Sequence, residues 1–237
     1  MTRRLILIFG LCCLLVAAEG PKQKIQVSNT QRLDFSSGGL LTLKNSLGEL
    51  WIRGEDRPDV SITATKSTKA EYDARNRETG TRELDQVLTT AERHGDELVV
   101  STTYPRHGVF ARPLRGGTTF DLVYDIKVPR NARVAVDHDN GYVFVDNLVS
   151  DIHVTSHQGS ITLRLPAEGH YAIDARSKFG SVSSDFPGHA QRKFWFVGQQ
   201  FINAGPSSAR KIYLRVGYGD IILLGAARTP LASPRAN

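Results

Sequence analysis

The sequence predicts an all-β protein with very little helix, and three observations lead to this fold class. Glycines recur at intervals of 18 or 21 residues, apolar and polar residues alternate on both sides of them, and turn-forming residues separate the alternating runs. More specifically, this pattern predicts a single-stranded β-solenoid, in which coils of 18–21 residues stack so that equivalent strands pair. With 40% apolar and 23% charged residues, the 237-residue chain suits a domain with a buried core.

The N-terminus predicts a secretory signal peptide over residues 1–18. Two arginines precede an apolar run at residues 5–15, and small residues follow it. The run is too short to span a bilayer comfortably, which disfavours an uncleaved anchor, and Leu11 before Cys12 disfavours a lipoprotein site. We therefore expect an exported protein, in the periplasm, the cell envelope or the extracellular space, that is not an integral membrane protein after cleavage.

Cleavage would remove both cysteines, Cys12 and Cys13, and leave a mature chain without thiols. Disulfides, thiolate metal sites and cysteine nucleophiles are then excluded. Cleavage would also remove two basic residues, so the formal net charge of +6 becomes 28 − 24 = +4. This mild charge on an exported chain argues against a nucleic-acid partner.

The repeat unit places apolar residues seven and five positions before a glycine and two and four positions after it. Five copies fill nineteen of the twenty template positions with apolar residues, where the 40% composition predicts eight. Each half of a unit is then a short strand with one buried face, and the glycine supplies a corner of positive φ. The copies are centred on Gly48, Gly141, Gly159, Gly180 and Gly219.

Two points about this repeat stay open. The unit at Gly198 breaks the template, which predicts a coil shifted in register or bulged outward. A β-sandwich is the competing architecture, because it also has short alternating strands at regular spacing. The regular glycine interval favours the solenoid.

The rest of the chain predicts further strands, a loop and a tail. A strand is expected at 60–64, a polar loop with a helical turn at 66–81, a hairpin from 87–91 and 98–100, and a strand at 120–128 that Pro129 ends. The predicted domain organisation is a signal peptide at 1–18, the β-solenoid domain at 19–224 and a disordered tail at 225–237.

The motifs around the glycine corners resemble a known family. The strings at 124–129, 139–143, 158–161 and 179–182, in this order and spacing, are similar to those of the DUF4097 "putative adhesin" family, and the resemblance covers most of the mature chain. It implies a secreted or envelope-located bacterial β-solenoid with no assigned catalytic residues. The adhesin label of that family rests on architecture and is an analogy for function.

No catalytic signature is present, so we predict no catalytic, cofactor-binding or metal-binding residues and no enzyme activity. A single metal site remains an alternative to a solvated polar ladder, since His138, His153 and His157 lie near successive corners with Asp137 and Asp139. The position two before the glycine holds Asp139, His157 and Lys178, which we expect to stack along one edge.

A glycan-active enzyme is a second alternative, because β-solenoid lyases and hydrolases work with clustered carboxylates. A catalytic pair of acids needs a defined separation, and nothing in the spacing of the acids requires one. The six aspartates considered are Asp137, Asp139, Asp146, Asp151, Asp174 and Asp185.

The segment 104–119, called the basic segment below, contains no acid and carries Phe110 among basic residues. Arginine forks suit carboxylate or phosphate groups of an envelope glycan or lipid, so three arginines are the predicted contacts to an anionic ligand. These are Arg106, Arg112 and Arg115. The alternative is a connecting loop whose charges only keep it soluble.

The predicted function is therefore an exported, non-catalytic binding or adhesin-like module, with an envelope or surface polysaccharide or protein as its partner and no cofactor. A structural or stress-associated envelope protein without a dedicated ligand is the main alternative.

Overall fold

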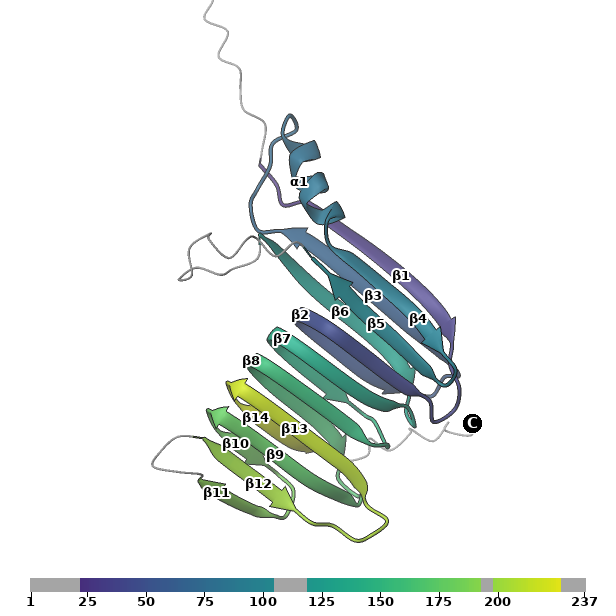
Figure 1. Ribbon diagram of the computed structural model, residues 1–237, viewed down its shortest axis with the longest axis vertical. Coiled ribbons are helices and arrows are strands. Elements are labelled where there is room, and N and C mark those ends of the chain that lie inside the picture. Colours follow the sequence, from purple (N-terminus) through teal and green to yellow (C-terminus); the bar gives the residue numbers. More distant parts are fainter. Residues whose placement is uncertain (1–21, 105–118, 193–197, 227–237) are drawn as a thin grey trace, which may run out of the picture.

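The computed structural model describes residues 22–104, 119–192 and 198–226, and nearly all regular structure in them is β-strand. The predicted signal peptide, residues 105–118 of the basic segment and the chain after Ala226 lie outside the described residues. In chain order the elements of Figure 1 are β1 (Gln26–Asp34), β2 (Leu40–Glu55), β3 (Asp59–Thr68), α1 (Arg77–Asp85), β4 (Leu88–His94), β5 (Glu97–Thr103), β6 (Phe120–Pro129), β7 (Arg133–Asp146), β8 (Ile152–Pro166), β9 (Tyr171–Phe179), β10 (Val182–Ser184), β11 (His189–Arg192), β12 (Gln199–Asn203), β13 (Arg210–Tyr218) and β14 (Ile221–Ala226).

The prediction of an all-β protein with very little helix is confirmed. The strands form one 14-stranded mixed sheet, whose main path runs β1-β3-β6-β2-β7-β8-β13-β9-β12-β11. The hairpin predicted around residue 95 is confirmed as the antiparallel pair β4–β5, and the strand predicted at 120–128 is confirmed as β6. Within the stretch expected to be a loop with a helical turn, β3 continues to Thr68 and α1 begins at Arg77.

The central strands stack as parallel rungs that bend at a glycine. β2, β7 and β8 each contain such a bend, and they pair in parallel along both halves, so that Leu41 lies beside Val134 and Leu50 beside Val143. β13 with β14, and β9 with β10, repeat the two halves as separate strands. Figure 1 shows β2, β7, β8, β13 and β9 one above another.

The order of the rungs corrects one expectation. We expected each coil to pair with the next coil in sequence, but the C-terminal pair β13–β14 lies between β8 and β9. Ile212 of β13 is thus the register partner of both Ile152 and Ile173. The template is nearly the same in every copy, so it defines the shape of a rung without defining its neighbours.

The unit at Gly198 is not a shifted or bulged coil, as the sequence suggested. β12 follows this glycine and runs antiparallel to β9, and β11 runs antiparallel to β12. Antiparallel strands need no crossover and no shared corner, which explains why the template is absent there.

A column of glycines forms the corner of the stack. In Gly48, Gly141, Gly159 and Gly219 φ lies between 83° and 133°, a range that side chains disfavour. A Cβ added to Gly141 would overlap the backbone oxygen of Gly48, and one added to Gly159 would overlap that of Gly141. Each rung therefore lies where the side chain of the next corner residue would otherwise be, and only glycine lets the rungs approach this closely.

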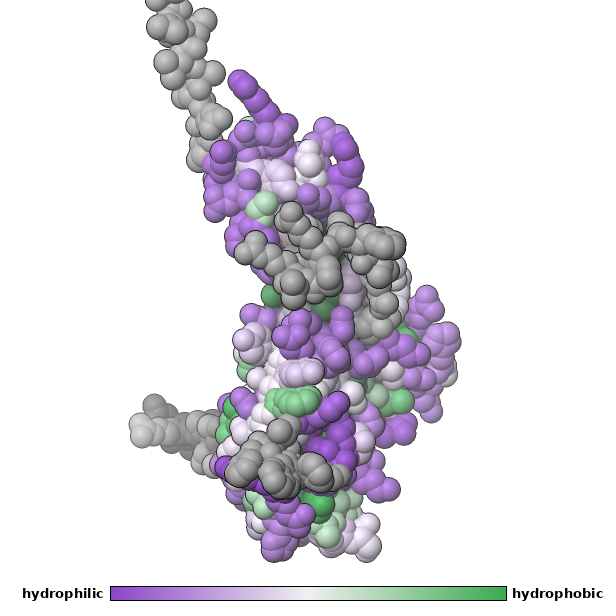
Figure 2. Space-filling model, turned by 60° about the vertical axis from the view of Figure 1, so that its left-hand side comes forward, coloured by the Kyte–Doolittle hydropathy of each residue, from purple (hydrophilic) through white to green (hydrophobic). Residues whose placement is uncertain are grey.

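The core is the space enclosed by the two halves of the rungs. Alternate residues of the central strands point into it, and burying each Val, Ile or Leu contributes on the order of 1.5–3 kcal/mol. The outward residues are mainly polar, and Figure 2 shows one face that is mostly hydrophilic with small hydrophobic patches. In the central strands two consecutive residues therefore mostly belong to different environments, and this alternation decides which side chains can form a site.

Candidate ligand-binding groove

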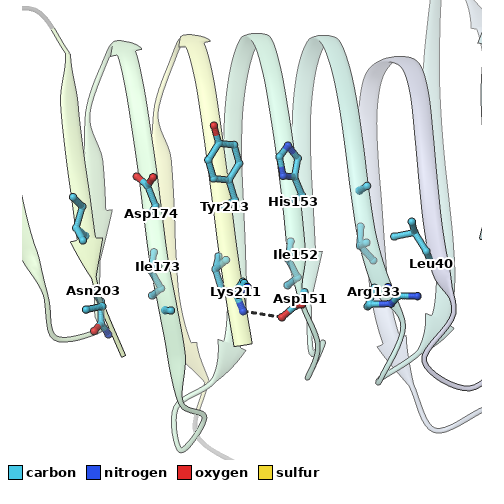
Figure 3. A pocket seen from close by; sticks show the side chains of 16 residues that line it. Leu40, Arg133, Asp151, Ile152, His153, Ile173, Asp174, Asn203, Lys211 and Tyr213 are labelled. Carbon is cyan, nitrogen blue, oxygen red and sulfur yellow. Dashed lines mark hydrogen bonds between the residues drawn. The ribbon is translucent and has the colours of Figure 1, made fainter. Parts of the chain in front are cut away.

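A shallow, open groove crosses the outer side of the first halves of the rungs. Its cavity volume is about 640 Å³, and it runs over β2, β7, β8, β13 and β9 to the segment that follows β12. The surface of the groove is mainly apolar, with charged side chains at its margins. Figure 3 shows the lining side chains, among them the labelled His153, Asp174 and Tyr213. Ala135 and Ala172 also line the groove.

An aromatic pair stands in the middle of the groove. Tyr213 of β13 is the register partner of His153 of β8, and their rings stack with centroids 4.5 Å apart and planes 18° apart. Tyr213 remains 37% exposed although its ring is fixed in this stack. A ring held in one orientation loses little conformational freedom on binding, so it is a preorganised contact surface.

The other side of Tyr213 is fixed by an ion pair. The guanidinium carbon of Arg215 lies 3.7 Å from the centroid of the Tyr213 ring, and its Nη2 donates to Asp174 Oδ2 at 2.5 Å. Arg215 also donates to the backbone oxygens of Asp174 and Leu214. Since His153 and Asp174 are on strands to either side of β13, the Tyr213 ring is sandwiched between the imidazole and the guanidinium.

Asp174 is ionised in this arrangement. Its partial burial favours the neutral acid, but the hydrogen bond and charge of Arg215, with a hydrogen bond from Gln200 Nε2 at 3.1 Å, outweigh that effect and lower the pKa of Asp174 below its ordinary value. The carboxylate therefore accepts hydrogen bonds at the margin of the groove and does not act as an acid near neutral pH.

A charged row lies parallel to the aromatic pair. Arg133 is the first residue of β7, Asp151 immediately precedes β8, and Lys211 is in β13. Arg133 Nε donates to Gly38 O, and Asp151 Oδ1 accepts from the Lys211 backbone N–H at 2.8 Å, the contact dashed in Figure 3. The Nζ of Lys211 and the Nη atoms of Arg133 are thus placed as donors along the same margin.

Small residues create the open space between these groups. Ala135 is the register partner of His153, so the face of the imidazole that does not touch Tyr213 is next to a methyl group only. Ala172, the register partner of Lys211, is similarly small on the other side. An apolar floor with an aromatic wall and charged margins can accept a molecule that has both C–H faces and hydroxyl or charged groups.

The three histidines of the metal hypothesis are not brought together. His138 is buried in the interior at 1% exposure, His153 lines the groove, and His157 packs edge-on against Tyr218 with centroids 6.2 Å apart. Across residues 22–104, 119–192 and 198–226, no group of three or more His, Cys, Asp or Glu side chains is placed to hold a metal ion.

The expected edge ladder is interrupted. Asp139 of β7 and His157 of β8 occupy equivalent positions on adjacent strands, because the residues on either side of them are register partners. His157 and Lys178 are not on adjacent strands, because β13 lies between β8 and β9 and has Gly217 at this position. The insertion of the C-terminal rung explains the interruption. Asp139 accepts a hydrogen bond from the Tyr104 hydroxyl at 3.2 Å.

Four of the six acids considered for a glycan-active enzyme are paired with different groups. Asp146 forms an ion pair with Arg164 on the next rung, Asp185 accepts from the Gly225 N–H, and Asp174 and Asp151 have the partners given above. Each of these carboxylates therefore has a local structural partner. The three arginines Arg106, Arg112 and Arg115 lie outside the described residues, so their predicted role stays a prediction.

Sequence reasoning missed the groove, although a signal for it exists. Thr42, Ala135, His153, Asp174 and Tyr213 all occupy the position six before a corner glycine, which is an outward position of the template. The repeat template is defined by the inward, apolar positions and does not include this outward one. If these outward residues are ordered by sequence, Asp174 falls next to His153. The structure shows instead that Tyr213 lies between them.

Neither a protein-family model nor a curated protein sequence matches the chain. Among solved structures, a "putative cell adhesion protein" from Clostridium sporogenes is 11% identical with a TM-score of 0.47, over 84% of this chain and all of that one. A "putative adhesin" from Bacteroides fragilis is 10% identical with a TM-score of 0.31, over 84% and 97% of the two chains. A "Putative lipid binding protein" from Parabacteroides distasonis is 11% identical with a TM-score of 0.21, over 66% and 70%.

These TM-scores are too low to carry an argument about fold or function, and membership of the DUF4097 family stays a prediction. The structure itself adds one fact about membranes. In the described part of the chain, no helix has the length and apolar character needed to cross a bilayer.

Proposed function

We propose that this protein is an exported, non-catalytic binding module of the bacterial cell envelope that holds a polysaccharide along the groove. In this proposal residues 19–224 form a β-solenoid, 1–18 are a signal peptide and 225–237 a tail. The parallel, in-register rungs on either side of the glycine column support the solenoid. A stack of this kind is a rigid support for repeated contacts with a polymer.

The observation that carries the proposal is the open face of the His153 imidazole, which the sandwiched Tyr213 ring holds in place beside the space over Ala135. Sugars present C–H faces that pack on aromatic rings and hydroxyl groups that bond to charged side chains. The imidazole of His153 offers such a face, and Asp174 and Lys211 offer an acceptor and donors at the two margins. The groove is open along its length, so a chain of sugar units can cross the rungs.

The test is binding of cell-envelope polysaccharide fractions and defined oligosaccharides, measured by isothermal titration calorimetry. Tyr213→Ala should weaken binding by at least tenfold, about 1.4 kcal/mol, since it removes the ring that fixes the His153 imidazole and the exposed edge of that ring from the groove. Tyr218→Ala is the matched control. Tyr218 lies on the same strand, is 51% exposed and stacks on Phe179 at 4.7 Å, but it is outside the groove.

Each outcome decides between the classes of function. Binding that Tyr213→Ala and Tyr218→Ala weaken equally would contradict the groove. No binding by the wild type, with co-purification of envelope components, would favour a structural envelope protein. Release of reducing ends or unsaturated sugars from the polysaccharides would show an enzyme and overturn the proposal.

A further inference from the structure

The strand β1 forms one boundary of the large sheet and has an unused edge. It is nine residues long and pairs antiparallel with β3 along its whole length, from Gln26 with Ser67 to Asp34 with Asp59. Among the described residues no strand pairs with its other edge. Residues before β1 stay in line with it, because Gln23 forms a β-bridge with Tyr72 just beyond β3.

This edge lacks the usual protection. Natural edge strands are shortened, bulged, or interrupted by proline or lysine, which prevents pairing with another chain. β1 contains no Pro, Gly or Lys, its two charged residues Arg32 and Asp34 lie near its C-terminal end, and its register with β3 is continuous. Its central side chain, Thr30, is exposed and hydrogen-bonds to Thr63 of β3 through their hydroxyls at 2.9 Å.

The sequence of β1 matches itself when the strand is reversed about Thr30. A twofold antiparallel pair centred there places Val27 opposite Leu33 and Asn29 opposite Gln31 on the inner face. On the outer face it places Ser28 opposite Arg32, and Thr30 opposite its own copy. Apolar meets apolar and amide meets amide, with no charge opposite a like charge, so the strand is complementary to a second copy of itself.

Two further observations at this end agree with a covering partner. Val27 is 38% exposed and Leu88 of β4, in the opposite layer, is 56% exposed. A cavity of about 180 Å³ lies between β1 and β4 at this end of the core, and the buried residues Ile62 and Ala64 are part of its lining. A twofold axis midway between Thr30 and its copy would bring the same end of a second molecule near these residues.

We propose that the protein self-associates through β1, with a second copy of this chain paired antiparallel about Thr30. The two 14-stranded sheets then continue into one another. A nine-residue strand gives a smaller contact than the 1,200–2,000 Å² typical of stable complexes, so the dimer is weak and depends on concentration. The groove is on the other layer of the stack, and the association does not rest on the proposed function.

The test is sedimentation velocity of the exported chain from low to high micromolar concentration, without ligand. Thr30→Lys places like charges opposite each other in the dimer while the side chain stays in solvent, and it should raise the dissociation constant by about tenfold or more. Thr30→Asp should do the same. An equimolar mixture of the two variants should restore association, because the heterodimer pairs opposite charges.

Ser183→Lys is the matched control. Through the register partners of the intervening strands, Ser183 is in the same outer row as Thr30 but on β10, at the far end of the sheet, and it is also exposed. A wild type that is monomeric at all concentrations would overturn the proposal. So would a dimer that Thr30→Lys leaves intact, or one that both lysine variants weaken equally.

Discussion

Lowering the pH should destabilise the fold through one buried histidine. His138 occupies an inward position next to the glycine column, where it is 1% exposed and its Nδ1 shares a hydrogen bond of 2.9 Å with the Ser46 hydroxyl. Burial lowers its pKa from 6.5 to about 4, and weaker interactions with the backbone and with Asp139 oppose that effect. The imidazole is therefore neutral in the folded protein near neutral pH.

The magnitude follows from the two pKa values. Between pH 6.5 and about 4 the unfolded chain binds a proton that the folded chain does not, so the free energy of unfolding falls as the pH falls through this range. The pKa difference is about 2.5, and each pKa unit corresponds to about 1.4 kcal/mol, so the full loss is about 3 kcal/mol. Below about pH 4 both states carry the proton and this contribution to the pH dependence ends.

The assay is urea unfolding at pH 7.5 and pH 4.5, compared between the wild type and His138→Val. Valine is chosen because Val216 occupies the equivalent position in β13. The wild type should lose roughly 2.5 kcal/mol more than the variant between the two pH values. His157→Gln, at an exposed position, should keep the wild-type loss.

Equal pH dependence in the wild type and His138→Val would refute the reasoning. A direct measurement covers the case in which the variant does not fold. In a proton NMR titration of the wild type, the ring C–H resonances of His138 should move near pH 4, and movement near pH 6.5 would also refute it.

Three further predictions concern the corner, the core and the basic segment. Gly141→Ala should cost at least about 3 kcal/mol in urea unfolding, because the new Cβ combines positive φ with overlap of the neighbouring backbone, whereas Gly95→Ala, with positive φ and open space, should cost only about 1–2 kcal/mol. Tyr124→Phe should cost about 1–2 kcal/mol by the same assay, because it leaves the buried Thr102 hydroxyl without its partner, and a cost near zero would contradict this contact. Replacing the three arginines of the basic segment by alanine should abolish salt-sensitive binding to envelope fractions at low ionic strength, and unchanged binding would show that the segment is only a connection.

The sequence predicts the repeating unit well because its cause is local. Along a strand, side chains alternate between the core and the solvent, so the apolar residues two positions after a corner glycine, such as Val143 and Ile161, are predicted in the core and are buried. The glycines predicted at the corners have positive φ. The same alternation separates His138 from His153, since one lies on the inward and the other on the outward parity of its strand. Applying parity would have removed His138 from the proposed metal site from the sequence alone.

The order of the rungs is not local, and the groove depends on it. Tyr213 contacts His153 only because a strand sixty residues later in the chain pairs with β8 in place of β9. Ile212 meets isoleucines on both sides, and any rung with the same template would offer a similar contact. Pairing energy between near-identical repeats therefore discriminates poorly between neighbours, and a sequence pattern carries little information about them.

The interleaved C-terminal rung has a consequence for how the protein is made. A nascent chain emerges N-terminus first, so β7 and β8 can pair as soon as both are synthesised, but β9 appears before the strand that joins it to β8. The lower part of the stack therefore assembles only when synthesis is nearly complete, and a ribosome that stops before residue 210 yields two fragments of sheet with no connecting strand. The sheet is therefore complete only after the C-terminal strands β13 and β14 have been synthesised.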